Sequence, residues 1–177
     1  MTRNTFRVLT AAAAMTVCAS IAPASTSHSA LSMQEAAQTL QELRSDKRAL
    51  ATKLDELNAL ARNNHLTSWQ SHAVVFDEVR EIINRAGRKL SRLEAGMDML
   101  PAGKQNAAGA IRADLARIAP EVQALMSEIR EFQLITLRPE YTARVRALSD
   151  RAVEARKNTD RAVRMALNST GSQQTGD

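Results

Sequence analysis

The chain has few of the residues on which disulfide-rich, all-β and membrane-spanning proteins depend. It has one cysteine, four prolines and six glycines among 177 residues, and aromatic residues make up 3%. A single cysteine excludes a disulfide framework and a cysteine-based metal site. The shortage of glycine, proline and aromatic residues disfavours sandwiches, barrels and disordered chains, and it favours long helices. No interior run of uncharged apolar residues reaches the roughly 18 residues of a membrane span.

The first 24 residues have the pattern of a secretory signal. Arg3 and Arg7 give a positive start, an uncharged apolar run follows, and Ala22-Pro23-Ala24 supplies small residues for cleavage. Cys18 would leave with this segment, and a cysteine-free product suits an oxidising compartment. We therefore predict an exported protein, either periplasmic or secreted.

From residue 32 onward the apolar residues recur with a helical, heptad-like spacing. We predict one domain over residues 25–168 and a disordered polar tail over 169–177. The predicted helices cover about 32–62, 68–96, 104–137 and 139–167. Short connections make neighbouring helices antiparallel. The fold predicted is an all-α, up-down four-helix bundle, and an elongated helical hairpin that dimerises is the alternative.

Local signals refine these helices. Ser32 with Glu35 fits a capping box at the start of the first helix. Lys47 is the only polar residue on the apolar stripe of that helix, as His72 is on the second. Pro120 falls on the outer face of an apolar stripe that continues through it, so we predict a kink in one helix and no boundary.

Antiparallel order would collect unusual side chains at the two ends of the bundle. One end would carry the aromatic residues and a histidine, namely Trp69, His72, Phe76, Phe132 and Tyr141. The other end would carry Met33, Met97, Met99 and Met165. Aromatic residues most often close a core and methionines most often fill its gaps. The alternative is a metal site, because Met97 and Met99 offer thioether ligands for Cu(I).

No pattern in the chain indicates catalysis. There is no Gly-x-Ser-x-Gly, no His-Glu-x-x-His and no phosphate-binding glycine loop. The chain also lacks Cys-x-x-Cys-His for covalent haem and Glu-x-x-His for a di-iron site. We predict no catalytic residue, no cofactor and no metal ligand.

The fourth predicted helix is rich in arginine, and its apolar stripe is thin and dominated by alanine. An exported location and the lack of interleaved aromatic residues disfavour nucleic acid as a partner. Arg144, Arg151 and Arg156 are candidate residues for binding a partner protein. We expect the thin stripe either to be exposed beside these arginines or to be covered by a second copy of the chain.

One short motif resembles a known family. Leu66, Thr67 and Gln70 match the Leu-Thr-x-x-Gln signature of the LTxxQ group of periplasmic helical proteins, the Spy and CpxP type. Leu137-Arg138-Pro139-Glu140-Tyr141 looks like a degraded second copy, so the resemblance covers residues 66 to about 150. It implies an exported, helical, ATP-independent chaperone or stress adaptor that is usually dimeric. Thr67 with Gln70 also fits an ordinary capping box.

The sequence supports a binding protein more than an enzyme. The first hypothesis is an exported helical protein of the cell envelope that contacts a partner or an unfolded client protein without catalysis. The second is a structural or assembly bundle that forms a homodimer. The third is a metal- or haem-binding bundle.

Overall fold

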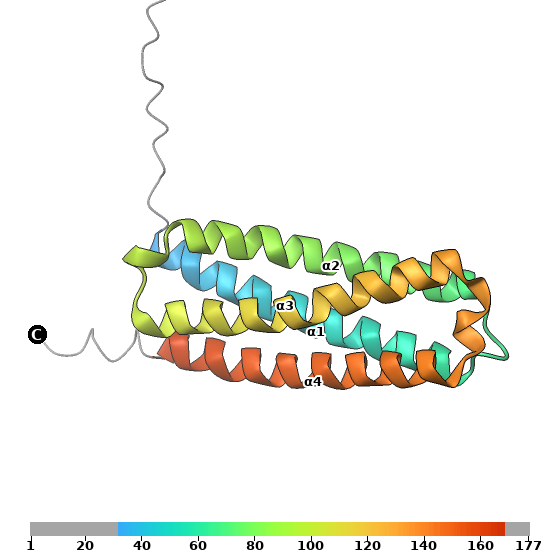
Figure 1. The fold of residues 1–177 in the computed structure, drawn as a ribbon. Coiled ribbons are helices and arrows are strands. Elements are labelled where there is room, and N and C mark those ends of the chain that lie inside the picture. The colour runs from blue at the N-terminus through green and yellow to red at the C-terminus, as the bar shows by residue number, and fades with distance from the viewer. Residues whose placement is uncertain (1–31, 169–177) are drawn as a thin grey trace, which may run out of the picture.

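Four long helices, arranged up and down, account for almost all of the described chain (Figure 1). The structure is a computed structural model, and it describes residues 32–168. Its long helices are α1 (Met33–Arg62), α2 (Trp69–Ala95), α3 (Ala102–Glu131) and α4 (Pro139–Asn168). Two short 3-10 helices, η1 (Met97–Met99) and η2 (Gln133–Leu137), lie in the connections. The predicted all-α bundle is confirmed, whereas the predicted signal and tail lie outside the described residues.

The helices begin where their capping residues place them. Ser32 and Glu35 form the predicted capping box, in which each side chain accepts a hydrogen bond from the other residue's backbone N–H (2.8 and 3.1 Å). The capping prediction for Thr67 is wrong by one residue. Ser68 is the N-cap of α2, because its hydroxyl oxygen accepts from the backbone N–H of Ser71, and this leaves the Thr67 hydroxyl available for other contacts.

The core runs along the whole bundle axis. α1 packs against α2 and α4, and α3 packs against the same two helices from the opposite side. A 30-residue helix is about 45 Å long, so the two ends of the bundle are separated by roughly that distance. The core is lined mainly by leucine, isoleucine, valine and alanine at the predicted heptad positions.

The third helix bends where proline was expected to bend it. Pro120 lies inside α3 with its ring exposed, and Figure 1 shows the helix changing direction along its length. The predicted end at residue 137 is wrong, because α3 stops at Glu131 and η2 follows. The buried apolar stripe of α3 ends at this point. Phe132 is 57% exposed, and of the residues in η2 only Ile135 and Thr136 turn toward the bundle.

Candidate functional site

A buried hydrogen-bonded network occupies the aromatic end of the bundle. The His72 ring lies fully buried on α2, and its Nδ1 atom is 2.8 Å from the Tyr141 hydroxyl of α4. Its Nε2 atom is 3.1 Å from the hydroxyl of Thr67, which in turn donates to the carbonyl oxygen of Leu60. We infer that Nε2 donates to Thr67 and that Nδ1 accepts from Tyr141. Because both ring nitrogens are satisfied, this histidine is a structural residue that joins α2 to α4.

The network gives a role to only one residue of the Leu-Thr-x-x-Gln motif. Thr67 is part of it, whereas Leu66 is 77% exposed. Gln70 is also exposed, and its side chain makes no hydrogen bond within residues 32–168. Of the predicted aromatic residues, Phe76 and Tyr141 are buried and Trp69 packs against the core, whereas Phe132 faces solvent.

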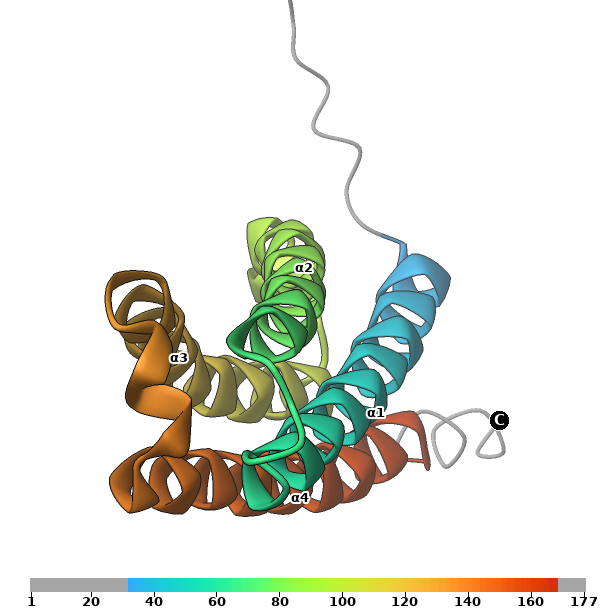
Figure 2. The same cartoon turned by 90° about the vertical axis from the view of Figure 1, so that its right-hand side faces the viewer.

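The two connections at this end present an apolar surface that we call the end patch. Its members are Leu66 (77% exposed), Phe132 (57%), Leu134 (75%) and Leu137 (53%). The Asn64 side chain donates to the backbone carbonyl of Thr136 over 3.0 Å, and this bond ties the first connection to η2. Both connections lie at the same end of the bundle in both views (Figures 1 and 2). Exposed apolar residues gathered in this way mark contact surfaces more often than isolated ones do.

A polar cluster crosses the core near the middle of the bundle. Lys47 of α1 is 2% exposed, and its Nζ atom lies 3.8 Å from the Asp114 carboxylate of α3. This ammonium group and Asp114 Oδ2 are buried and make no hydrogen bond within the described chain. Lys47 was predicted as the polar residue on its stripe, whereas Asp114 was not, although it lies three residues after Ile111 and four before Ile118 on one apolar stripe.

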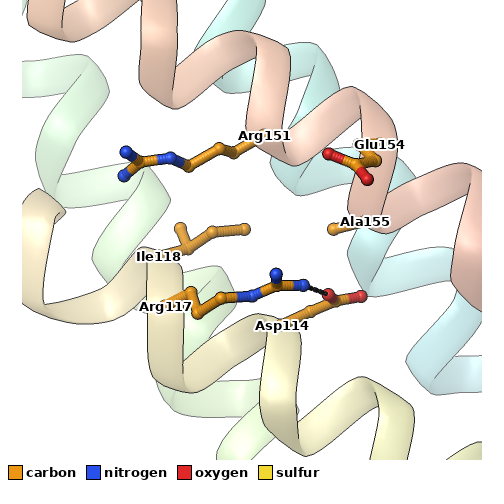
Figure 3. A pocket seen from close by; sticks show the side chains of 6 residues that line it. All are labelled: Asp114, Arg117, Ile118, Arg151, Glu154 and Ala155. Carbon is orange, nitrogen blue, oxygen red and sulfur yellow. Dashed lines mark hydrogen bonds and ion pairs between the residues drawn. The ribbon is translucent and has the colours of Figure 1, made fainter.

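Asp114 also lines a cavity of about 170 Å³ between α3 and α4 (Figure 3). Arg117 donates to its other carboxylate oxygen over 2.6 Å. Arg151 and Glu154 of α4 face the cavity from the other side, and neither forms an ion pair within residues 32–168. The Asp114 carboxylate is therefore held between a solvent-facing guanidinium and a buried ammonium group.

Burial of Lys47 should make the stability of the fold depend on pH. The pKa of its ammonium group is lowered to about 8, mainly because burial penalises the charged form, although the Asp114 carboxylate opposes the shift. Above pH 8 the folded chain has released this proton, whereas an unfolded chain with the ordinary lysine pKa of 10.5 still holds it. Unfolding then takes up a proton, so the free energy of unfolding should rise by roughly 2 kcal/mol between pH 8 and 10.

Urea unfolding followed by circular dichroism at a series of pH values would measure this rise. The interval ends near pH 10 because burial also raises the pKa of Tyr141, and ionisation of the unfolded tyrosine opposes the effect beyond that point. The variant Lys47→Met should show no comparable rise. An unchanged stability between pH 8 and 10 in the unaltered chain would contradict the assignment.

The three arginines named as partner-binding candidates have different surroundings. Arg144 is held within the bundle: its guanidinium donates to Glu121 (2.9 Å) and to Glu128 (2.7 Å) of α3. These hydrogen bonds raise the pKa of Arg144, first of all those that it donates to Glu128. Arg151 lines the cavity in Figure 3, and Arg156 is half-buried; neither forms an ion pair within the described residues.

The apolar stripe of α4 is covered by its own chain. Tyr141, Val145, Leu148, Ala152 and Ala155 are all at most 3% exposed, packed in the core with α1 and α3. The expectation that this stripe is exposed or needs a second copy to cover it is therefore wrong. The reason is the small size of alanine, which lets helix backbones approach closely enough to bury a thin stripe.

The methionine end is more exposed than core-filling methionines would be. Met33 is 40% exposed, Met99 72% and Met165 60%, while Met97 packs partly against the core. Within residues 32–168, no three histidine, cysteine, aspartate or glutamate side chains gather as metal ligands would. None of the helices in that range is both long and apolar enough to cross a membrane.

Comparison with known proteins adds no family. No protein-family model, curated protein or solved structure matches the chain.

Proposed function

We propose that the chain is an exported helical binding protein of the cell envelope, which acts by contact with other proteins and without catalysis. The observation that supports this proposal is the end patch of Leu66, Phe132, Leu134 and Leu137. The described helices bury most of their large apolar side chains in the core, yet the two connections at one end present four exposed ones. Their burial against an apolar partner would be favourable by the hydrophobic effect.

The surroundings of the end patch favour a partner with acidic groups beside its apolar residues. Arg62 ends α1 just before the first connection, and Arg138 follows Leu137 directly in the chain. Both arginines are exposed, and neither has an ion pair within the described residues. A chaperone-like contact with partly unfolded proteins fits this combination of apolar and cationic groups, and its affinity should fall as salt is added.

An aggregation assay tests the proposal. The chain 25–177, which keeps every core residue, is mixed at substoichiometric ratios with an unfolding test protein, and light scattering is followed. The double variant Leu66→Gln/Leu134→Gln should suppress aggregation about tenfold less effectively, because it removes two exposed apolar side chains from the contact.

The matched control is Met99→Gln/Met165→Gln, which changes two exposed apolar residues (72% and 60%) at the other end of the bundle. This control should suppress aggregation as well as the unaltered chain does. Equal losses in both double variants would show that the end patch has no special role. An unaltered chain that suppresses no aggregation at any ratio would refute the chaperone-like proposal and leave an assembly protein as the better hypothesis.

A further inference from the structure

The last three turns of α4 carry an open hollow of about 340 Å³ at the end of the bundle opposite the end patch. Its lining consists of Lys157, Asp160, Arg161, Arg164 and Met165. The three cations recur at intervals of four and three residues, so they lie on one face of α4 and span roughly 10 Å along the helix axis. All three are exposed, and none has an ion pair within residues 32–168.

Among the described residues, Asp160 is the only acid that lines this hollow, and it is already neutralised. Asp160 Oδ1 accepts from Arg44 over 2.5 Å and from Arg48 over 3.1 Å, and both arginines belong to the neighbouring helix α1. Burial acts to raise the pKa of Asp160, but these contacts outweigh it and lower the pKa, so the carboxylate is charged and paired with the two arginines. The nearest acid on α4 without an ion pair, Glu154, lies a turn away in the cavity beside Asp114. Within residues 32–168, the three cations of this face therefore have no carboxylate paired with them.

We propose that this face of α4, the cationic face (Lys157, Arg161 and Arg164 with Met165), binds the surface of an anionic phospholipid membrane without inserting a helix. Its cations are spread along a line and do not converge on one point, which suits a surface carrying many single negative charges. Met165 follows Arg164 directly and is 60% exposed, and it adds an apolar side chain that can enter the headgroup region. The proposal is independent of the end patch, which lies at the other end of the bundle.

Vesicle sedimentation tests the proposal with the chain 25–177. The protein should bind vesicles that contain phosphatidylglycerol and should not bind vesicles of phosphatidylcholine alone. Each basic side chain near an anionic surface contributes a several-fold gain in binding, so Lys157→Gln/Arg161→Gln/Arg164→Gln should weaken binding about 100-fold. The matched control is Arg62→Gln/Arg88→Gln/Arg92→Gln, which removes the same charge from exposed residues without ion pairs on α1 and α2. The control should retain most of the binding.

Soluble short-chain polyphosphate provides the second arm of the experiment. Met165→Gln should weaken binding to phosphatidylglycerol vesicles several-fold and leave any binding of polyphosphate unchanged. Equal weakening by the two triple variants would overturn the proposal, because binding would then follow net charge alone. Polyphosphate binding as tight as vesicle binding, with no effect of Met165→Gln on either, would assign the cationic face to soluble polyanions. Failure to bind phosphatidylglycerol vesicles would also overturn the proposal, and it would leave the aggregation assay unaffected.

Discussion

Replacement of Asp114 by leucine should lower the free energy of unfolding at pH 7 by about 3–5 kcal/mol. The substitution leaves Lys47 at 2% exposure and removes the only counter-charge that lies beside it among residues 32–168. The larger side chain has space, because Asp114 borders the cavity of about 170 Å³ between α3 and α4. The loss should shrink as the pH rises, since an unpaired buried ammonium group releases its proton more readily.

The double variant Lys47→Met/Asp114→Leu should not show this loss. Its free energy of unfolding should range from equal to that of the unaltered chain to about 4 kcal/mol higher. In the present fold this pair is a poor ion pair: its charged atoms are 3.8 Å apart, and neither Lys47 Nζ nor Asp114 Oδ2 has a hydrogen-bond partner. The single variant Lys47→Met should cost less than Asp114→Leu, because Arg117 still pairs with the remaining carboxylate.

Urea unfolding of all four chains completes this double-mutant cycle. A single variant Asp114→Leu as stable as the unaltered chain would show that Lys47 reaches solvent or another partner. A double variant less stable than both single variants would show that the pair makes a net favourable contribution, contrary to the geometry.

Leu54→Ala should lower the free energy of unfolding by about 3 kcal/mol, whereas Leu66→Ala should change it by less than about 0.5 kcal/mol. The two substitutions remove the same atoms, but Leu54 is fully buried in the core and Leu66 is 77% exposed. Thermal and urea unfolding measure both effects. A large loss for Leu66→Ala would mean that this leucine supports the fold, and it would weaken its use as a binding residue of the end patch.

Helix content and order were predictable because their causes are local. Apolar spacing sets the face of each helix, and capping depends on side chains a few residues apart, as for Ser32 and Glu35. The outward position of Pro120 followed from the same periodicity. The end of α3 was misjudged because periodicity counts apolar residues without showing whether a neighbouring helix is there to cover them. Phe132 and Leu134 continue the apolar composition but meet solvent.

The partners of polar side chains depended on distances that no sequence pattern contains. Lys47 was recognisable as an anomaly on an apolar stripe, but its partner lies 67 residues away on another helix, at a distance set by how α1 packs beside α3. Arg144 and Arg161 are chemically alike and lie on the same helix. Packing places two glutamates of α3 beside Arg144, whereas Arg161 forms no ion pair among the described residues.

Chain order and local periodicity were enough to predict four antiparallel helices, their apolar stripes and the residues gathered at each end. The surfaces available for contact became clear only from the packed helices. Packing buries the thin stripe of α4 in its own chain, exposes the end patch, and neutralises Asp160 beside cations that form no ion pair within residues 32–168. Burial and ion pairing depend on which groups lie opposite a side chain, and those groups are fixed only when the helices pack.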